Sequence, residues 1–263
     1  MDLELKNKVA LVTASSKGLG KAVAFELARE GAKVVICARD KNTLEKTAEE
    51  IRNATGTEVL SVVTDLTKAE DIKNLVKDTI TKFARIDILF TNAGGPPPGQ
   101  FMEFNDEDWK NAFELNLLSV VRLCKEVIPY MQRRGGGRII HSTSISVKQP
   151  LENLVLSNSL RAGVIGLSKT LANELGPDNI LVNAVCPGAT ATERLENLVK
   201  ARVEREGISE EDAKRGWTDA IPLGRLGTPE EFANLVVFLA SEKASNITGT
   251  AIQVDGGFYK GIL

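Results

Sequence analysis

The sequence is poor in several residue types that mark particular classes of protein. Among its 263 residues there are one histidine and three cysteines, and Cys37, Cys124 and Cys186 lie far apart. Metal sites usually draw on closely spaced cysteines and histidines, so we expect no metal and three reduced cysteines packed in the core. No apolar run approaches the roughly 20 residues that a membrane helix needs, so we expect no membrane partner.

The sequence also has no excess of positive or negative charge. Lysine and arginine number 33 against 35 acids, the formal net charge is −2, and no basic run occurs, which argues against a nucleic-acid partner. The first residues include Asp2 and Glu4, where a signal peptide has basic and then apolar residues, so we expect a cytoplasmic protein. The length fits a single domain that spans residues 1–263.

Short apolar runs alternate with amphipathic segments along the whole chain. Val9–Val12 is apolar throughout, as in a strand covered on both faces, and Leu19, Val23 and Leu27 then repeat at helical spacing. This alternation predicts an α/β, doubly wound Rossmann fold, with a single parallel sheet of about seven strands and helices on both faces. The expected strands are Lys8–Thr13, Lys33–Ala38, Val59–Val63, Ile86–Thr91, Arg138–Thr143, Ile180–Cys186 and Ala251–Val254. The expected helices start near Leu19 and cover Thr43–Asn53, Ala69–Phe83, Glu107–Arg133, Leu154–Leu175 and Pro229–Ala240, with two short ones in Glu193–Asp219.

A glycine-rich loop, residues 13–20, joins the first expected strand to the first expected helix. A helix start offers unpaired N–H groups and the positive end of a dipole, where a pyrophosphate can bind. Gly18 and Gly20 allow a closer approach of phosphate and neighbouring backbone than a β-carbon would permit. In this place, after the first strand of a βαβ unit, the loop predicts dinucleotide binding.

The loop resembles the Thr-Gly-x-x-x-Gly-x-Gly motif of the short-chain dehydrogenase/reductase family, with Ala14 in place of the first glycine. Other segments resemble family motifs in the family's order, over essentially the whole chain. They are Thr64-Asp65-Leu66, Thr91-Asn92-Ala93-Gly94, Asn183–Gly188, Pro222–Arg225 and Asp255-Gly256-Gly257. The resemblance is closest to the 3-oxoacyl-(acyl carrier protein) reductases. It implies an NADP-dependent oxidoreductase that acts on a small-molecule carbonyl or alcohol, and a homodimer or homotetramer paired through Glu107–Arg133 and Leu154–Leu175.

The resemblance also implies a set of cofactor-binding residues. They are Thr13, Ser15, Ser16, Lys17, Gly18, Leu19, Gly20, Arg39, Asp65, Leu66, Asn92, Ala93, Gly94, Pro187, Gly188, Thr190 and Thr192. The methyl group of Ala14 costs little if that residue has a negative φ. If the turn needs a positive φ, Ala14 strains the loop and weakens cofactor binding.

Charge at the end of the second strand bears on the choice between NADP and NAD. An acid there would hydrogen-bond the adenosine ribose and repel a 2′-phosphate, but this strand is followed by Arg39. With Lys17 in the nearby loop, two cations could meet the 2′-phosphate, which favours NADP. Alternatively both are solvated surface charges, and Asp40 keeps NAD possible if it points inward.

The family's catalytic tetrad of Asn, Ser, Tyr and Lys is only half retained. By resemblance, Asn116 anchors a water and Ser144 orients the substrate oxygen. Ser157 stands at the tyrosine position and Arg161 at the lysine position, with the register set by the following Ala162–Gly166. A serine hydroxyl is a poorer acid than a phenol, and arginine stays protonated, so it can bind ribose hydroxyls but cannot shuttle a proton.

Few other side chains could donate the proton. Tyr130 and Tyr259 align with no active-site position, and His141 lies inside a strand and is expected to be a packed core residue. Lys148 follows Ser144 on the loop expected to line the substrate cleft, where desolvation would lower its pKa. The alternative is that Lys148 is a solvated loop residue.

The segment at about 189–220 is expected to cover the substrate. Its cations could attract an anionic substrate or carrier, but interleaved glutamates favour a solvated amphipathic lid. The cations are Arg194, Arg202, Arg205, Lys214 and Arg215. Three hypotheses follow: an oxidoreductase with an altered proton route, a catalytically impaired dinucleotide-binding protein with a sensing or assembly role, or a lyase or isomerase without net hydride transfer. We rank them in that order because the cofactor motifs are largely retained.

Overall fold

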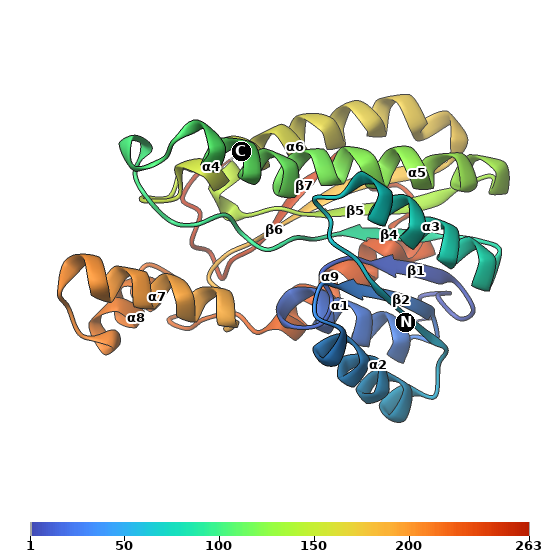
Figure 1. The fold of residues 1–263 in the computed structure, drawn as a ribbon, viewed down its shortest axis with the longest axis horizontal. Helices are drawn as coiled ribbons and strands as arrows, with labels where there is room; N and C mark the ends of the chain where they lie inside the picture. Colours follow the sequence, from blue (N-terminus) through green and yellow to red (C-terminus); the bar gives the residue numbers. More distant parts are fainter. Residues whose placement is uncertain (1, 263) are drawn as a thin grey trace.

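A computed structural model describes residues 2–262, so both end residues of the expected domain lie outside it (Figure 1). Seven strands form one sheet, ordered β3-β2-β1-β4-β5-β6-β7, and every neighbouring pair is parallel. The strands are β1 (Val9–Val12), β2 (Lys33–Ala38), β3 (Val59–Val63), β4 (Ile88–Thr91), β5 (Gly137–Ser142), β6 (Ile180–Pro187) and β7 (Ala251–Val254). The doubly wound Rossmann fold expected from the sequence is confirmed, and the strand bounds agree to within two residues.

Helices cover both faces of the sheet, which explains why β1, β4 and β5 are buried along their whole length. On one face lie α1 (Gly18–Arg29), α2 (Lys41–Thr55) and α9 (Pro229–Ala240). On the other lie α3 (Ala69–Phe83), α5 (Ser119–Arg134) and α6 (Val155–Leu175) (Figure 1). Each face has its own apolar cluster, the first around Leu27 and Phe232 and the second around Leu75 and Val127.

The long helix expected over Glu107–Arg133 is interrupted. It consists of α4 (Asp106–Phe113), a π-helical turn η2 (Glu114–Leu118) and α5. Single π turns inside α-helices are frequent at functional sites, and this one contains Asn116. The sequence analysis predicted one continuous helix here and did not detect the added residue of this turn.

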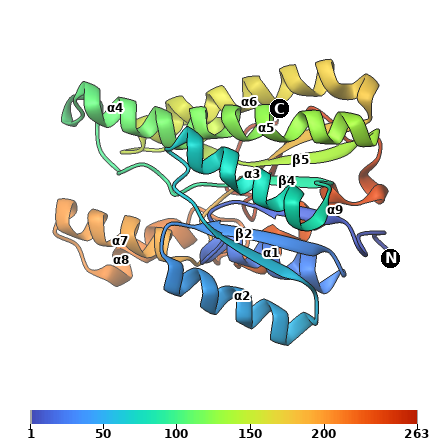
Figure 2. The same ribbon diagram turned by 45° about the vertical axis from the view of Figure 1, so that its right-hand side comes forward.

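The carboxyl edge of the sheet carries the long loops. Strand β6 leads through Pro187 into α7 (Glu193–Glu206) and α8 (Glu210–Thr218), the two short helices expected there. Figure 2 shows α7 and α8 projecting together from one end of the molecule. They share a small apolar cluster around Leu195, Val199 and Ala213.

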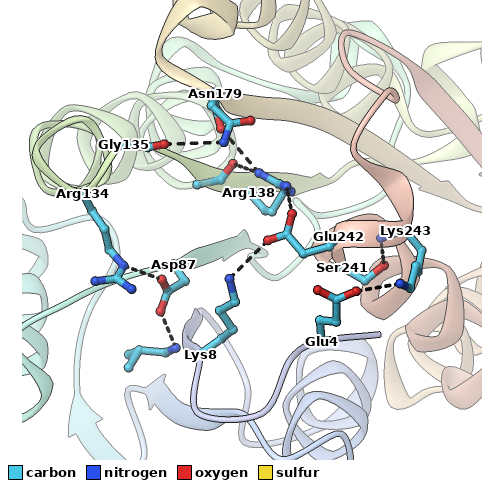
Figure 3. Close-up of polar contacts among 12 residues, drawn as sticks. Glu4, Lys8, Asp87, Arg134, Gly135, Arg138, Asn179, Ser241, Glu242 and Lys243 are labelled. Atoms are coloured by element: carbon cyan, nitrogen blue, oxygen red, sulfur yellow. Dashed lines mark hydrogen bonds and ion pairs between the residues drawn. The ribbon is translucent and has the colours of Figure 1, made fainter. Parts of the chain in front are cut away.

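The amino ends of the strands carry a separate polar network (Figure 3). Arg138 of β5 and Lys8, just before β1, both bond Glu242, at 2.8 and 3.2 Å. Asp87 accepts from the backbone N–H of Val9 and from Arg134, at 2.8 and 3.0 Å. A polar cavity of about 160 Å³ lies among these groups. Because this cavity is at the end of the sheet opposite the glycine-rich loop, we assign the network to holding neighbouring strands together.

His141 is a packed residue of β5, as expected from the sequence. Its side chain is buried, Nδ1 lies 2.7 Å from the Thr91 hydroxyl, and Nε2 has no partner among the described residues. Burial lowers the pKa of His141 from 6.5 to about 4. The imidazole is therefore neutral at pH 7, and the folded chain binds fewer protons at this residue than the unfolded chain does between pH 6.5 and 4.

We expect this residue to make the fold sensitive to acid. The contribution of His141 to the free energy of unfolding is full above pH 6.5 and falls by about 3 kcal/mol as the pH drops to 4. The measurement is urea unfolding of the wild type and His141→Asn at pH 7 and pH 4. The wild type is expected to lose about 3 kcal/mol more than the variant, and equal losses would contradict the buried, neutral imidazole.

Candidate active site

The glycine-rich loop closely contacts the end of β4. The Thr13 hydroxyl donates to the Asn92 carbonyl at 2.7 Å and accepts from the Asn92 N–H at 2.8 Å, which joins the ends of β1 and β4. Gly20 is packed against this turn, because a β-carbon there would lie 2.3 Å from the Ala14 carbonyl oxygen. Ser15 is also engaged, since its hydroxyl donates to Val12 and accepts from the Cys37 N–H.

The first turn of α1 has unsatisfied donors. No side chain caps the helix, Lys17 at the N-cap makes no capping bond, and the first turn holds no acid. The opening N–H groups of a helix need an acceptor, and the positive dipole end prefers an anion. A phosphate group fits this helix start, so the residues present suit a dinucleotide.

The sequence left open whether Ala14 has a negative φ or a strained, positive φ. Its φ is +46°, in the left-handed region, so the strained alternative is the one found. This backbone conformation costs a non-glycine residue roughly 1–2 kcal/mol. The Ala14 carbonyl nevertheless accepts a bond of 3.3 Å from the Asn92 amide, which helps to hold the turn.

We expect Ala14→Gly to raise the free energy of unfolding by about 0.5–1 kcal/mol. Relief of the left-handed strain stabilises the folded state. The greater conformational entropy that glycine gives the unfolded chain offsets about 0.4–1 kcal/mol of this gain. Urea unfolding at pH 7 measures the change, and Ala84→Gly at another positive-φ alanine, far from the loop, is the matched comparison. A destabilised Ala14→Gly variant would contradict the strain.

The cations expected at the 2′-phosphate lie near the loop. Lys17 is exposed, and its Nζ is 2.5 Å from the carboxylate of Glu193, the first residue of α7. Arg39 follows β2, is exposed, and has no ion pair within residues 2–262. Asp40 does not point inward, because its carboxylate caps α2 by accepting from the Thr43 N–H at 2.8 Å. The argument for NAD from Asp40 is therefore lost.

The other expected cofactor residues lie at the carboxyl ends of the strands or just beyond them. Thr190 is buried, and its hydroxyl donates to the Gly188 carbonyl, while the Thr192 hydroxyl donates to the Thr190 carbonyl. Asp65 accepts from the Thr67 N–H and hydroxyl at 3.0 and 2.8 Å. Gly18 and Leu19 begin α1, and the set at the strand ends and loops is Ser16, Leu66, Ala93, Gly94 and Pro187. In open α/β sheets this edge is where ligands bind.

The tetrad positions Asn116, Ser144, Ser157 and Arg161 lie on neighbouring elements at the same edge. Asn116 is buried, its amide donates to the Ala112 carbonyl at 3.2 Å, and its Oδ1 is enclosed with no partner among residues 2–262. Such an orphaned acceptor suits the ordered water that the resemblance implies. Ser144, directly after β5, accepts from the Ser146 N–H at 3.1 Å and so starts the short helix η3 (Ile145–Val147).

The two replaced positions are buried on α6. The Ser157 hydroxyl lies 3.3 Å from that of Ser146, a partner that the sequence analysis missed. Arg161 donates from one terminal nitrogen to the carbonyls of Ser142 and Thr143, both at 3.2 Å. Burial, and then the nearby charge of Arg194, lower the pKa of Arg161 to about 10, so it remains a cation at neutral pH.

Lys148 lies within the electrostatic reach of this site. It ends η3, is half-buried, and has no ion pair among the described residues. Burial raises the pKa of the Cys186 thiol at the end of β6, while the Thr143 hydroxyl and the charge of Lys148 lower it. Tyr130 stays on α5, where Arg133 stacks over its ring at 4.4 Å. Tyr259 lies in the C-terminal segment, and its N–H donates to Asp255.

Comparison with known proteins agrees with this geometry. A family described as "Enoyl-(Acyl carrier protein) reductase" matches residues 13–259. A 3-oxoacyl-[acyl-carrier-protein] reductase of Staphylococcus epidermidis is 36% identical, over 96% of this chain and 99% of that protein. The chain belongs to the short-chain dehydrogenase/reductase family.

Other members of the short-chain dehydrogenase/reductase family are similarly related. Dehydrogenase/reductase SDR family member 4 of Homo sapiens is 36% identical, over 96% of this chain and 88% of that protein. The L-sorbose reductase of Gluconobacter frateurii, solved with NADPH and L-sorbose, is 37% identical with a TM-score of 0.95, and both chains are covered completely.

No group of three or more metal-ligating His, Cys, Asp or Glu side chains gathers within residues 2–262. The three cysteines are buried and unpaired. In the same part of the chain, no helix is long and apolar enough to cross a membrane.

Proposed function

We propose that this protein is an NADP-dependent oxidoreductase that interconverts a small carbonyl compound and its alcohol by a non-standard proton route. The observation that carries the proposal is the uncapped start of α1, with its free N–H groups, at the same sheet edge as Asn116 and Ser144. The complex of the related sorbose reductase with NADPH supports the choice of cofactor. When bound, the cofactor supplies or accepts the hydride.

The residues of this chain would bind the cofactor from several sides. The N–H groups of Gly18, Leu19 and Gly20 would meet the diphosphate, and Lys17 with Arg39 would meet the 2′-phosphate. The nitrogens of Arg161 that do not bond Ser142 or Thr143 would donate to the nicotinamide ribose hydroxyls.

The substrate oxygen needs an orienting group and a proton source. The Ser144 hydroxyl would orient the oxygen, and Asn116 would hold a water through its orphaned Oδ1. The buried Ser157 hydroxyl is too weak an acid to replace a phenol. We therefore propose Lys148, the half-buried cation at the end of η3, as the proton donor.

The proposal is tested by following NADPH oxidation across a panel of ketones and 3-oxoacyl thioesters. Turnover of at least one compound is expected, and Lys148→Met is expected to lower kcat by about 10²-fold without changing the Kd for NADPH. Lys77→Met, at an exposed position of α3, is the matched control. Tight NADPH binding with no turnover on any compound would instead favour the alternative below.

The alternative is a catalytically impaired dinucleotide-binding protein with a sensing or assembly role. The observation in its favour is that Ser157 and Arg161 are both occupied by internal bonds, to Ser146 and to the β5 end. A binding protein of this kind would keep the cofactor-binding residues and lose catalytic activity, whereas a reductase keeps both.

We further propose that residues 1–263 act as one domain in a cytoplasmic homodimer or homotetramer, with α4–α5 and α6 as the pairing surface. Phe113 of α4 is 42% exposed in the single chain, as an apolar residue at such a surface would be. Residues 189–220, with α7 and α8, would cover the substrate. Light scattering at micromolar concentration tests the assembly, and a monodisperse monomer would contradict it.

A further inference from the structure

The five cations singled out in the sequence of residues 189–220 divide into two groups. Four of them pair with glutamates on their own helices: Arg202, Arg205, Lys214 and Arg215. Arg194 differs, because it has no carboxylate partner among the described residues and is half-buried. The interleaved glutamates therefore neutralise these four cations, as expected from the sequence, but not Arg194.

Arg194 reaches from the first turn of α7 to the loop after β4. One terminal nitrogen donates to the Pro96 carbonyl at 2.6 Å. The guanidinium lies against the backbone of Gly95, where an added β-carbon would be only 2.8 Å from its central carbon. Arg194 therefore bridges the substrate-covering segment and the loop that leaves the carboxyl end of β4.

A second guanidinium without a carboxylate partner lies close to it. Arg161 is only 8% exposed and bonds two carbonyls, and the structure gives it no ion pair. The charge of Arg194 contributes to lowering the pKa of Arg161, so the two cations act on each other. Both Arg161 and Lys148 also act electrostatically on the Cys186 thiol.

One carboxylate shares this neighbourhood, that of Asp255. Its two oxygens accept from the backbone N–H groups of Gly257 and Tyr259, at 2.9 and 2.8 Å, so it holds the C-terminal turn. Among the described residues, Arg161, Lys148 and Asp255 thus act on Cys186, and Arg194 acts on Arg161, so three cations and one engaged acid gather near the end of β6. Unpaired cations held out of water destabilise the empty site, and a cleft lined with one sign of charge attracts the opposite charge.

We propose that the substrate is a small oxo compound with an ionised oxyanion, a carboxylate or a phosphate ester, and that Arg194 binds this group. The planar fork of a guanidinium matches the oxygens of either group. The inference rests on the proposed function, since the oxyanion belongs to the compound that is reduced. Arg194 is then a specificity residue that selects free oxo acids over their neutral esters.

The test compares acids with matched neutral compounds. Short 2- and 3-oxo acids are assayed with NADPH beside their methyl esters, and a ketose phosphate beside the free ketose, which separates carboxylate from phosphate. The wild type is expected to favour one anionic class by about 10-fold or more in kcat/KM. Arg194→Gln is expected to raise KM for that class by about 10- to 100-fold and to leave the neutral compounds within twofold.

Two variants and one binding measurement complete the design. Arg194→Lys keeps the charge without the planar fork, and its KM for the anionic class is expected to fall between those of the wild type and Arg194→Gln. Arg205→Gln, which removes an exposed ion pair on the same helix, is expected to behave as the wild type. Calorimetric titration of the NADP⁺ complex with the anionic compound measures binding in the absence of turnover. If the wild type binds the anion and Arg194→Gln does not, the inference is supported even if no compound is reduced. Equal use of neutral and anionic compounds, no anion binding, or a weaker Kd for NADPH in Arg194→Gln would overturn it.

Discussion

Ser157→Tyr combined with Arg161→Lys is expected to raise the rate of ketone reduction with NADPH by about 10²–10⁴-fold. A positioned general acid typically contributes that factor, and a lysine beside the phenol lowers its pKa from near 10. Both positions are on α6, four residues apart and hence on one helix face. The two new side chains would therefore act together.

The double variant needs a matched control that shares its bulk. Ser157 is only 5% exposed and its hydroxyl lies 3.3 Å from that of Ser146, so a larger side chain must displace its neighbours. Ser157→Phe with Arg161→Lys adds the same ring without the hydroxyl and is expected to show no rise in rate above the wild type. A folded Tyr–Lys variant that binds NADPH and is no faster than this control would refute the missing-acid argument.

Removing both Lys17 and Arg39, as Lys17→Ala with Arg39→Ala, is expected to weaken NADPH binding by about 10²-fold or more. Each charge-assisted bond to a phosphate is worth roughly 1.5–3 kcal/mol, and NADH carries no 2′-phosphate to lose. The Kd for NADH is expected to stay within about twofold. Fluorescence titration of each variant with both dinucleotides measures the preference.

Glu193→Gln provides the control for this prediction. In the free protein Glu193 holds Lys17 in an exposed ion pair, which competes with the 2′-phosphate for the same ammonium group. Such pairs are worth up to about 1 kcal/mol, so freeing Lys17 is expected to tighten NADPH binding by no more than about fivefold. If the double alanine variant loses NADPH and NADH equally, the two cations do not select the cofactor.

The fold was largely predictable because the inner strands β1, β4 and β5 are buried on both faces and therefore read as short apolar runs. The edge strands β3 and β7 are only partly buried but are rich in apolar residues, and they fall at the expected residues, as β2 and α3 do. The π turn at Asn116 was not predicted, since it depends on local backbone hydrogen bonding that residue type alone does not specify. Sequence order also predicts that the expected cofactor residues lie close together, because the carboxyl ends of parallel strands meet at one edge.

The parts of the site that the sequence left open depend on contacts between distant segments. Whether Ala14 is strained depends on the turn forced by its neighbours, and φ +46° gives the answer. Arg194 was grouped with four other cations because composition cannot distinguish paired from unpaired ones. Its bond to Pro96, 98 residues away, and the pairing of Ser146 with Ser157 exist only in the folded chain.

The central claim is that this site binds NADP in a form ready for hydride transfer, and calorimetric titration of the purified protein with NADPH and with NADH tests it most directly. The account predicts saturable binding of one NADPH per chain, with NADH at least about tenfold weaker. If neither dinucleotide binds, the strain at Ala14 has disabled the loop, and the proposed function is wrong at its first step.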